Sequence, residues 1–204
     1  MNKTGVIYGI NGPVVYLKGN TGFKMSEMVY VGKERLVGEV IALTKDTTTV
    51  QVFEETTGLK PGETVTASGD ALSVTLGPGI LNNIFDGIER PLSEIAKQSG
   101  KYISRGLTVD SLDTEKKWDV HVTVSEGEEL MGGAIIAETQ ETRSIVHKSM
   151  VPPDVNGTVI WAAKDGKYTI LDPIVKLKLE DGTEKEITLA QKWPIRVPRP
   201  TLKR

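Results

Sequence analysis

The 204-residue sequence contains no cysteine, which excludes disulfide bridges, thiolate metal sites and cysteine nucleophiles. Aromatic residues make up only 5% of the chain, so a core has to be built from valine, isoleucine, leucine and alanine. No apolar run reaches the roughly 18 residues that a membrane-spanning helix needs, and the first residues lack the apolar stretch of a signal peptide. We therefore expect a cytoplasmic protein with no direct membrane insertion.

An excess of positive charge is also missing, because 25 Lys and Arg residues face 27 Asp and Glu residues and give a formal net charge of −2. Proteins whose main partner is nucleic acid are usually basic, since neutralising phosphates supplies much of their affinity. The charge balance therefore argues against nucleic acid as a partner.

A phosphate-binding loop is absent from these residues. Such a loop needs Gly-x-x-x-x-Gly-Lys-[Ser/Thr], because its backbone N–H groups and lysine hold the phosphates and its hydroxyl holds magnesium. Gly-Lys occurs at 32–33, 100–101 and 166–167, but the next residue is glutamate or tyrosine each time. We expect the chain itself to hydrolyse no ATP.

Other catalytic and metal-binding patterns are equally weak. The two histidines, His121 and His147, are too few for a metal site, which needs three or four converging ligands, and we predict hydrogen-bonded or solvated structural roles for them. Glu54 and Glu55 lie at a predicted turn, where we expect solvated side chains. No Gly-x-Ser-x-Gly elbow exposes a serine nucleophile. We predict no catalytic, cofactor-binding or metal-binding residue in this chain.

What the sequence does contain is glycine and proline, 21 and 10 residues respectively, which favour short strands and tight turns. The β-rich runs of the first part, separated by turn residues, are 4–10, 14–18, 27–31, 35–43, 47–53 and a start at 64. In the fifth run Val50 and Val52 share one face, which we expect to point inward together with Val40. Short strands can bury a small core by closing on themselves, which also removes exposed edges. We therefore predict a small closed barrel.

The sequence changes character between residues 68 and 108. Residues 92–98 are the best helix candidate, with Pro91 near the first turn and Gly100 as a stop. Nearby apolar residues include Ile80 and Ile84. The segment around them is too short to supply the side chains that would bury them. We expect them to pack against a domain outside this chain.

Strand-like runs return between residues 109 and 190, with Asp181-Gly182 as a hairpin turn. They predict a second all-β module. Three prolines within residues 194–200 then predict an extended connector.

Several segments point, in order, to one family. They are Gly12-Pro13-Val14-Val15, 51–59 (QVFEETTGL), 76–81 (LGPGIL), 84–92 (IFDGIERPL), 147–153 (HKSMVPP) and 191–194 (QKWP). This set resembles the N-terminal part of the catalytic (A/alpha) subunit of a vacuolar/archaeal-type (V-type/A-type) rotary ATPase or ATP synthase. The last two segments resemble the edges of an insertion typical of that subunit. The related non-catalytic chain and the mitochondrial-type catalytic chain lack this insertion.

The resemblance implies a mainly β architecture in four parts. They are a small N-terminal β-barrel (1–69), the start of a truncated nucleotide-binding domain with a short helical segment (70–109), an inserted all-β module facing the stator (110–190) and a Pro-rich connector to a phosphate-loop domain (191–204). The barrel is implied to assemble with the non-catalytic B-type subunit into a hexamer, and the module to contact the peripheral stalk. The resemblance places the chain in the cytoplasm, peripheral to the membrane.

For the full-length subunit, the resemblance implies that hydrolysis or synthesis of Mg-ATP is coupled to proton or sodium transport. It implies no cofactor for the present residues.

Two alternatives come from other classes. Residues 127–159 resemble half of a biotinyl/lipoyl carrier domain, but Glu141 stands where a carrier has its attachment lysine, and Lys148 comes too late. The scaffold is compatible with a carrier while the attachment chemistry is absent. A stand-alone all-β binding module is the other alternative, against which the uncovered apolar residues and the Pro-rich end argue.

Overall fold

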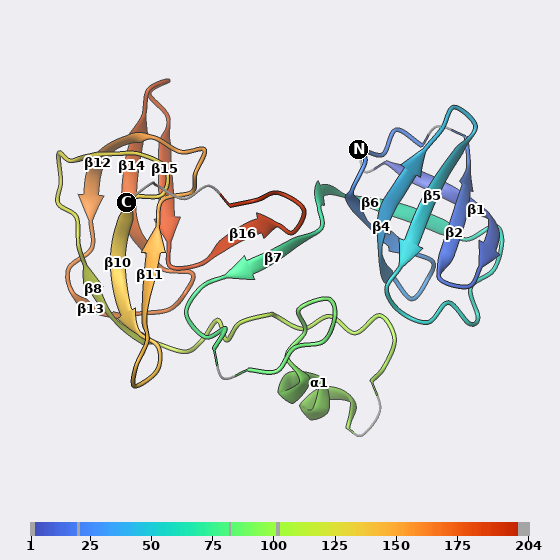
Figure 1. The fold of residues 1–204 in the computed structure, drawn as a ribbon, viewed down its shortest axis with the longest axis horizontal. Coiled ribbons are helices and arrows are strands. Elements are labelled where there is room, and N and C mark those ends of the chain that lie inside the picture. The colour runs from blue at the N-terminus through green and yellow to red at the C-terminus, as the bar shows by residue number, and fades with distance from the viewer. Residues whose placement is uncertain (1–2, 20, 82, 101–102, 200–204) are drawn as a thin grey trace. The chain divides into compact units, whose positions relative to one another are not determined.

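The computed structural model describes residues 3–19, 21–81, 83–100 and 103–199 (Figure 1). Within these ranges the chain is mainly β with one short helix, which confirms the predicted fold class. It divides into two compact units. Unit 1 comprises residues 3–73, 85–109 and 194–196, and unit 2 comprises residues 74–84, 110–193 and 197–199.

Unit 1 contains the predicted barrel. Its strands are β1 (Thr4–Asn11), β2 (Val14–Lys18), β3 (Glu27–Val31), β4 (Leu36–Leu43), β5 (Thr47–Val52) and β6 (Thr64–Ala71). They close in the order β1-β2-β5-β4-β3-β6. Val40, Val50 and Val52 are buried inside, as the alternation predicted, because every second side chain of a strand points to the same face. Gly38 allows β4 to approach β5, since a Cβ there would lie 2.9 Å from the carbonyl oxygen of Gln51.

The predicted helix is confirmed as α1 (Leu92–Ser99). Pro91 precedes it in an extended conformation. Gly100 ends it with a positive φ of 71°, and the N–H of Gly100 donates a hydrogen bond to the carbonyl of Ala96. Ile95 is the buried residue of the helix. One buried side chain cannot hold a two-turn helix by itself, so the surrounding chain of unit 1 has to support it.

Unit 2 is built from two four-stranded sheets, ordered β11-β10-β8-β13 and β15-β14-β12-β9. The strands are β8 (Trp118–Val122), β9 (Glu129–Leu130), β10 (Ile135–Gln140), β11 (Val146–Met150), β12 (Gly157–Ala162), β13 (Gly166–Tyr168), β14 (Pro173–Leu179) and β15 (Glu184–Thr188). One core draws on both sheets: Ile136 from β10 and Leu177 from β14 are fully buried in it. This confirms the second all-β module.

Outside the barrel and the second module, two short strands have no counterpart among the strands expected from the sequence. They are β7 (Ser73–Leu76) and β16 (Gln191–Pro194), which pair in a two-stranded sheet. Four residues are too few to show a period, and the proline of β16 argues against a strand interior. The expectation that Ile80 lies uncovered was also wrong, because this side chain packs against the core of unit 2, whereas Ile84 is 73% exposed.

Candidate functional site

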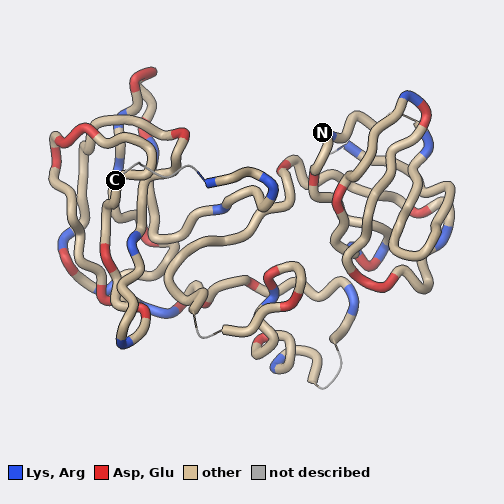
Figure 2. The backbone as a smooth tube through the Cα atoms, viewed as in Figure 1, with Lys and Arg blue, Asp and Glu red and all other residues tan. Residues whose placement is uncertain are grey.

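Charged residues are spread over both units, with positive and negative positions interspersed along the described chain (Figure 2). Among them, two clusters are buried and a third borders a groove. Among the described residues, no three His, Asp, Glu or Cys side chains converge in a way that could hold a metal ion.

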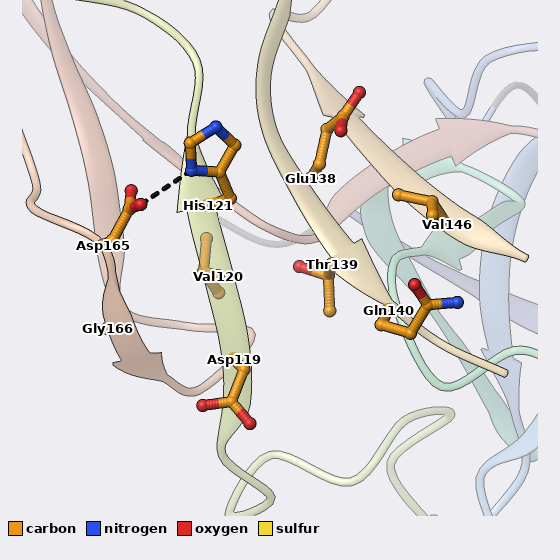
Figure 3. Close-up of a pocket in the computed structure, with 9 residues that line it drawn as sticks. All are labelled: Asp119, Val120, His121, Glu138, Thr139, Gln140, Val146, Asp165 and Gly166. Atoms are coloured by element: carbon orange, nitrogen blue, oxygen red, sulfur yellow. Dashed lines mark hydrogen bonds and ion pairs between the residues drawn. The ribbon is translucent and has the colours of Figure 1, made fainter. Parts of the chain in front are cut away.

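The groove lies beside β8 and β10 and contains His121 (Figure 3). His121 Nδ1 lies 2.7 Å from Oδ2 of Asp165, and the N–H of Val122 donates to Oδ1 of the same carboxylate at 2.8 Å. The hydrogen bond to Asp165, followed by its charge, raises the pKa of His121. Glu138 lies opposite His121 in the β8–β10 register. Because the histidine and aspartate side chains are about two thirds exposed, water screens the pair and its contribution to stability is small.

His147 belongs to a second cluster, around the buried carboxylate of Glu141. Glu141 follows β10 directly, and its side chain is only 3% exposed. Its Oε1 accepts the N–H groups of Gly79 at 2.8 Å and Leu81 at 2.9 Å, while its Oε2 lies 3.5 Å from Nδ1 of His147. Burial lowers the pKa of His147 more than the neighbouring Glu141 charge raises it. The carboxylate therefore joins the β10–β11 hairpin to the loop after β7, inside unit 2.

The third cluster is buried in unit 1 around Arg90. Its guanidinium donates from Nε to Oδ2 of Asp86 at 2.7 Å and from Nη1 to the carbonyl of Leu107 at 3.0 Å, and Nη1 lies 3.4 Å from Oε2 of Glu54. The same Oε2 accepts the N–H of Gly106 at 3.1 Å. Burial would raise the pKa of Asp86, but hydrogen bonds from the backbone and side chain of Arg90 outweigh it, and the pKa is lowered.

The Arg90 cluster corrects the expectation for Glu54. The sequence placed this residue at a solvated turn, whereas its side chain is only 8% exposed. Its partners Arg90 and Gly106 follow 36 and 52 residues later. No local pattern connects positions that far apart, so the burial of Glu54 had no signal in the sequence.

None of these clusters pairs a nucleophile with a base, and the arrangement of each is suited to holding segments of chain together. Comparison with protein families gives two matches. The ATP synthase alpha/beta family beta-barrel domain matches residues 7–69, and the ATP synthase alpha/beta subunit barrel-sandwich domain matches residues 109–196. The chain belongs to the ATP synthase alpha/beta family. The first domain coincides with the closed barrel of unit 1, and the second covers both four-stranded sheets of unit 2.

Several members of this family are similar in sequence to nearly the whole of the chain. The chain is 50% identical over 200 residues to the V-type ATP synthase alpha chain of Halothermothrix orenii, covering 98% of this chain and 34% of the relative. It is 51% identical over 196 residues to the A subunit of the A-type ATP synthase of Methanopyrus kandleri, covering 96% of this chain and 33% of the relative. V-type ATP synthase alpha chain 2 of Clostridium tetani is 50% identical, with the same coverages as the Methanopyrus protein.

The chain thus spans about a third of the length of these relatives. Among the described residues, no helix is both long and apolar enough to cross a membrane.

Proposed function

We propose that this chain is the N-terminal part of the catalytic subunit of a V-type or A-type ATP synthase, a rotary ATPase peripheral to the membrane on its cytoplasmic side. The observation that supports this most strongly is the identity of about half of all positions with V-type alpha chains and the A-type A subunit, over nearly the whole of this chain. In the complete subunit, hydrolysis or synthesis of Mg-ATP is coupled to the transport of protons or sodium ions. The domain limits remain those predicted: 1–69, 70–109, 110–190 and 191–204.

The barrel serves assembly with the non-catalytic B-type subunit. A closed barrel has no free sheet edge to offer, so contact has to come from outward side chains. Val6 and Tyr8 on β1 are 54% and 51% exposed, and the Tyr8 ring lies 6.2 Å from that of Tyr16. Exposed aromatic and aliphatic side chains of this kind favour a protein partner.

The second module serves contact with the peripheral stalk. The two charged clusters of this module, around His121 and Glu141, contain no residue set suited to nucleophilic or metal-assisted catalysis, and the module has its own two-sheet core. A self-supporting module can bear a mechanical contact without distorting a nucleotide site.

Nucleotide titration tests the assignment of ATP chemistry to the rest of the subunit. Because the 204 residues include no Gly-x-x-x-x-Gly-Lys-[Ser/Thr] loop, calorimetric titration of this chain with Mg-ATP is expected to be flat. Micromolar binding accompanied by turnover would contradict the proposal.

A deletion tests the role of the module. Residues 112–188 are removed from the full-length subunit, with a short Gly-Ser bridge in their place. We expect ATP hydrolysis to remain, while stalk attachment and coupling to ion transport are lost. Coupling that survives the deletion would remove the stalk role, whereas loss of all folding in the nucleotide-binding domain would show that the module is structural.

A further inference from the structure

The loop that follows β7 presents two backbone N–H groups to one anionic oxygen. This loop, residues 77–81, is called the glycine loop below. The N–H groups of Gly79 and Leu81 converge on Oε1 of Glu141 at 2.8 and 2.9 Å, with Gly79 at a φ of 110°. Successive backbone N–H groups that turn to the same side form a concave site for anions. In this chain the anion comes from a side chain about sixty residues further along.

Burial makes these two hydrogen bonds important for the Glu141 carboxylate. A carboxylate withdrawn from water is costly unless charged-group hydrogen bonds replace its hydration, and such bonds are about twice as strong as neutral ones. The Glu141 side chain is 3% exposed, and its nearest cationic candidate, His147, lies 3.5 Å away with a lowered pKa. Backbone N–H groups therefore provide the main compensation for this charge.

The glycine loop is held in shape by packing that does not involve Glu141. A Cβ on Gly77 would lie 3.2 Å from Cα of Ala190, and a Cβ on Gly79 would lie 3.4 Å from Cζ2 of Trp118. Asn83 Nδ2 donates to the carbonyl of Gly79 at 2.7 Å. Because these neighbours leave the loop little room and Asn83 holds one of its carbonyl groups, we expect the two N–H groups to keep their direction when the carboxylate is removed.

We propose that the glycine loop is an anion-binding site for a carboxylate-sized oxyanion, and that its resident ligand is Glu141. The ligand joins the β10–β11 hairpin to the loop that follows β7. This proposal goes beyond the assembly role above, because it requires neither ATP nor a partner subunit.

Chemical rescue tests the anion site directly. Glu141→Ala removes one methylene and the carboxylate, which together match the size of acetate. Thermal unfolding of the 204-residue chain is measured with increasing sodium acetate, and with acetamide or sodium chloride as controls. We expect the variant to melt below wild type and its Tm to rise saturably with acetate alone, while wild type shows no saturable response. A variant that responds equally to acetate, acetamide and chloride would overturn the proposal.

Hydrogen exchange locates the effect. In Glu141→Ala, the amides of Gly79 and Leu81 are expected to exchange at least tenfold faster than in wild type and to slow again in acetate. Unchanged exchange at both amides would overturn the proposal.

A milder pair of variants keeps the test decisive if the alanine variant does not fold. Glu141→Gln keeps an oxygen acceptor but removes the charge, and Glu138→Gln makes the same change on β10 at a side chain that is 36% exposed. We expect exchange at Gly79 and Leu81 to become severalfold faster in Glu141→Gln and to stay unchanged in Glu138→Gln. Equal rates in the two variants would show that the negative charge is not required, and would overturn the proposal.

Discussion

Arg196 binds the buried carboxylate of Glu39 with both arms of its guanidinium. Nε donates to Oε1 at 2.5 Å and Nη2 donates to Oε2 at 2.6 Å, and the Glu39 side chain is 1% exposed. Next to it, the N–H of Ile195 donates to the carbonyl of Leu72. Glu39 lies on β4 of the barrel and Arg196 lies 157 residues later, just after β16. The pair therefore fixes a late segment of the chain to the barrel within unit 1.

This pair predicts that the stability of the chain depends on the geometry of the Arg196 side chain as well as on its charge. Arg196→Lys keeps the charge but cannot donate two parallel hydrogen bonds, so we expect a Tm between that of wild type and that of Arg196→Met. Lys192→Met, at an exposed position of β16, is the control and should melt like wild type. A lysine variant as stable as wild type would show that charge alone is sufficient.

The same pair predicts an acid-dependent loss of stability. The hydrogen bond from Arg196 is the main cause that lowers the pKa of Glu39 below its usual 4.5. A carboxyl group with a lower pKa in the folded state stabilises the fold above its unfolded pKa, and this stabilisation is lost as the pH falls through the folded pKa. As the pH falls below 4.5, the Tm of wild type should therefore fall more steeply than the Tm of Glu39→Gln. Parallel titration curves for the two proteins would contradict this.

Arg90 is expected to be far more important for stability than an exposed cation of the same unit. Arg90→Met leaves Glu54 and Asp86 buried without their common partner, which should cost about 3–5 kcal/mol. Lys97→Met removes the exposed pair with Glu94 on α1 and should cost less than about 1 kcal/mol. Urea unfolding of the two variants measures the difference. Similar losses in both would mean that water replaces the guanidinium in the Arg90 cluster.

The two histidines are expected to change the stability of the fold with pH in opposite directions. The pKa of His147 is lowered by burial, so its contribution to stability is complete above the unfolded value of 6.5 and is lost as the pH falls through the folded pKa. The pKa of His121 is raised by Asp165, so its contribution is complete below 6.5 and is lost as the pH rises through the folded pKa.

Unfolding free energies measured between about pH 5 and pH 8 separate the two residues. Relative to wild type, His147→Gln should lose less stability on acidification, and His121→Gln should lose more. The groups facing His147 are Glu141, which raises its pKa, and Arg199, whose charge lowers it. A His147→Gln variant with the wild-type pH slope would show that this imidazole is not desolvated in the folded state.

Because β5 has one face in the barrel interior, the same substitution at two neighbouring positions of this strand should have very different effects on stability. Val52 is 2% exposed, and Val52→Asp would bury a carboxylate without a partner at a cost of several kcal/mol. Gln51 is exposed on the opposite face, so Gln51→Asp should change the Tm little. Equal melting of the two variants would contradict the assigned register.

The sequence alone was sufficient to predict the barrel, because a period of two along a strand indicates which side chains point inward. Val50 and Val52 show this, and their burial confirms it. Helix α1 was equally readable, since Pro91 and Gly100 mark its ends through backbone geometry that each residue imposes locally. Family membership was readable too, because it depends on the order and identity of residues.

Only the tertiary structure decided which charges are buried and which segments they join. Glu54 and Arg90, Glu39 and Arg196, and Glu141 with the glycine loop are separated by 36 to 157 residues. A buried carboxylate and a solvated one look the same in a sequence, because the difference between them is the partner that folding brings within hydrogen-bonding distance. The pairing of β7 with β16 was hidden for the same reason: four-residue strands lack a period, and their partners are defined only by the course of the chain between them.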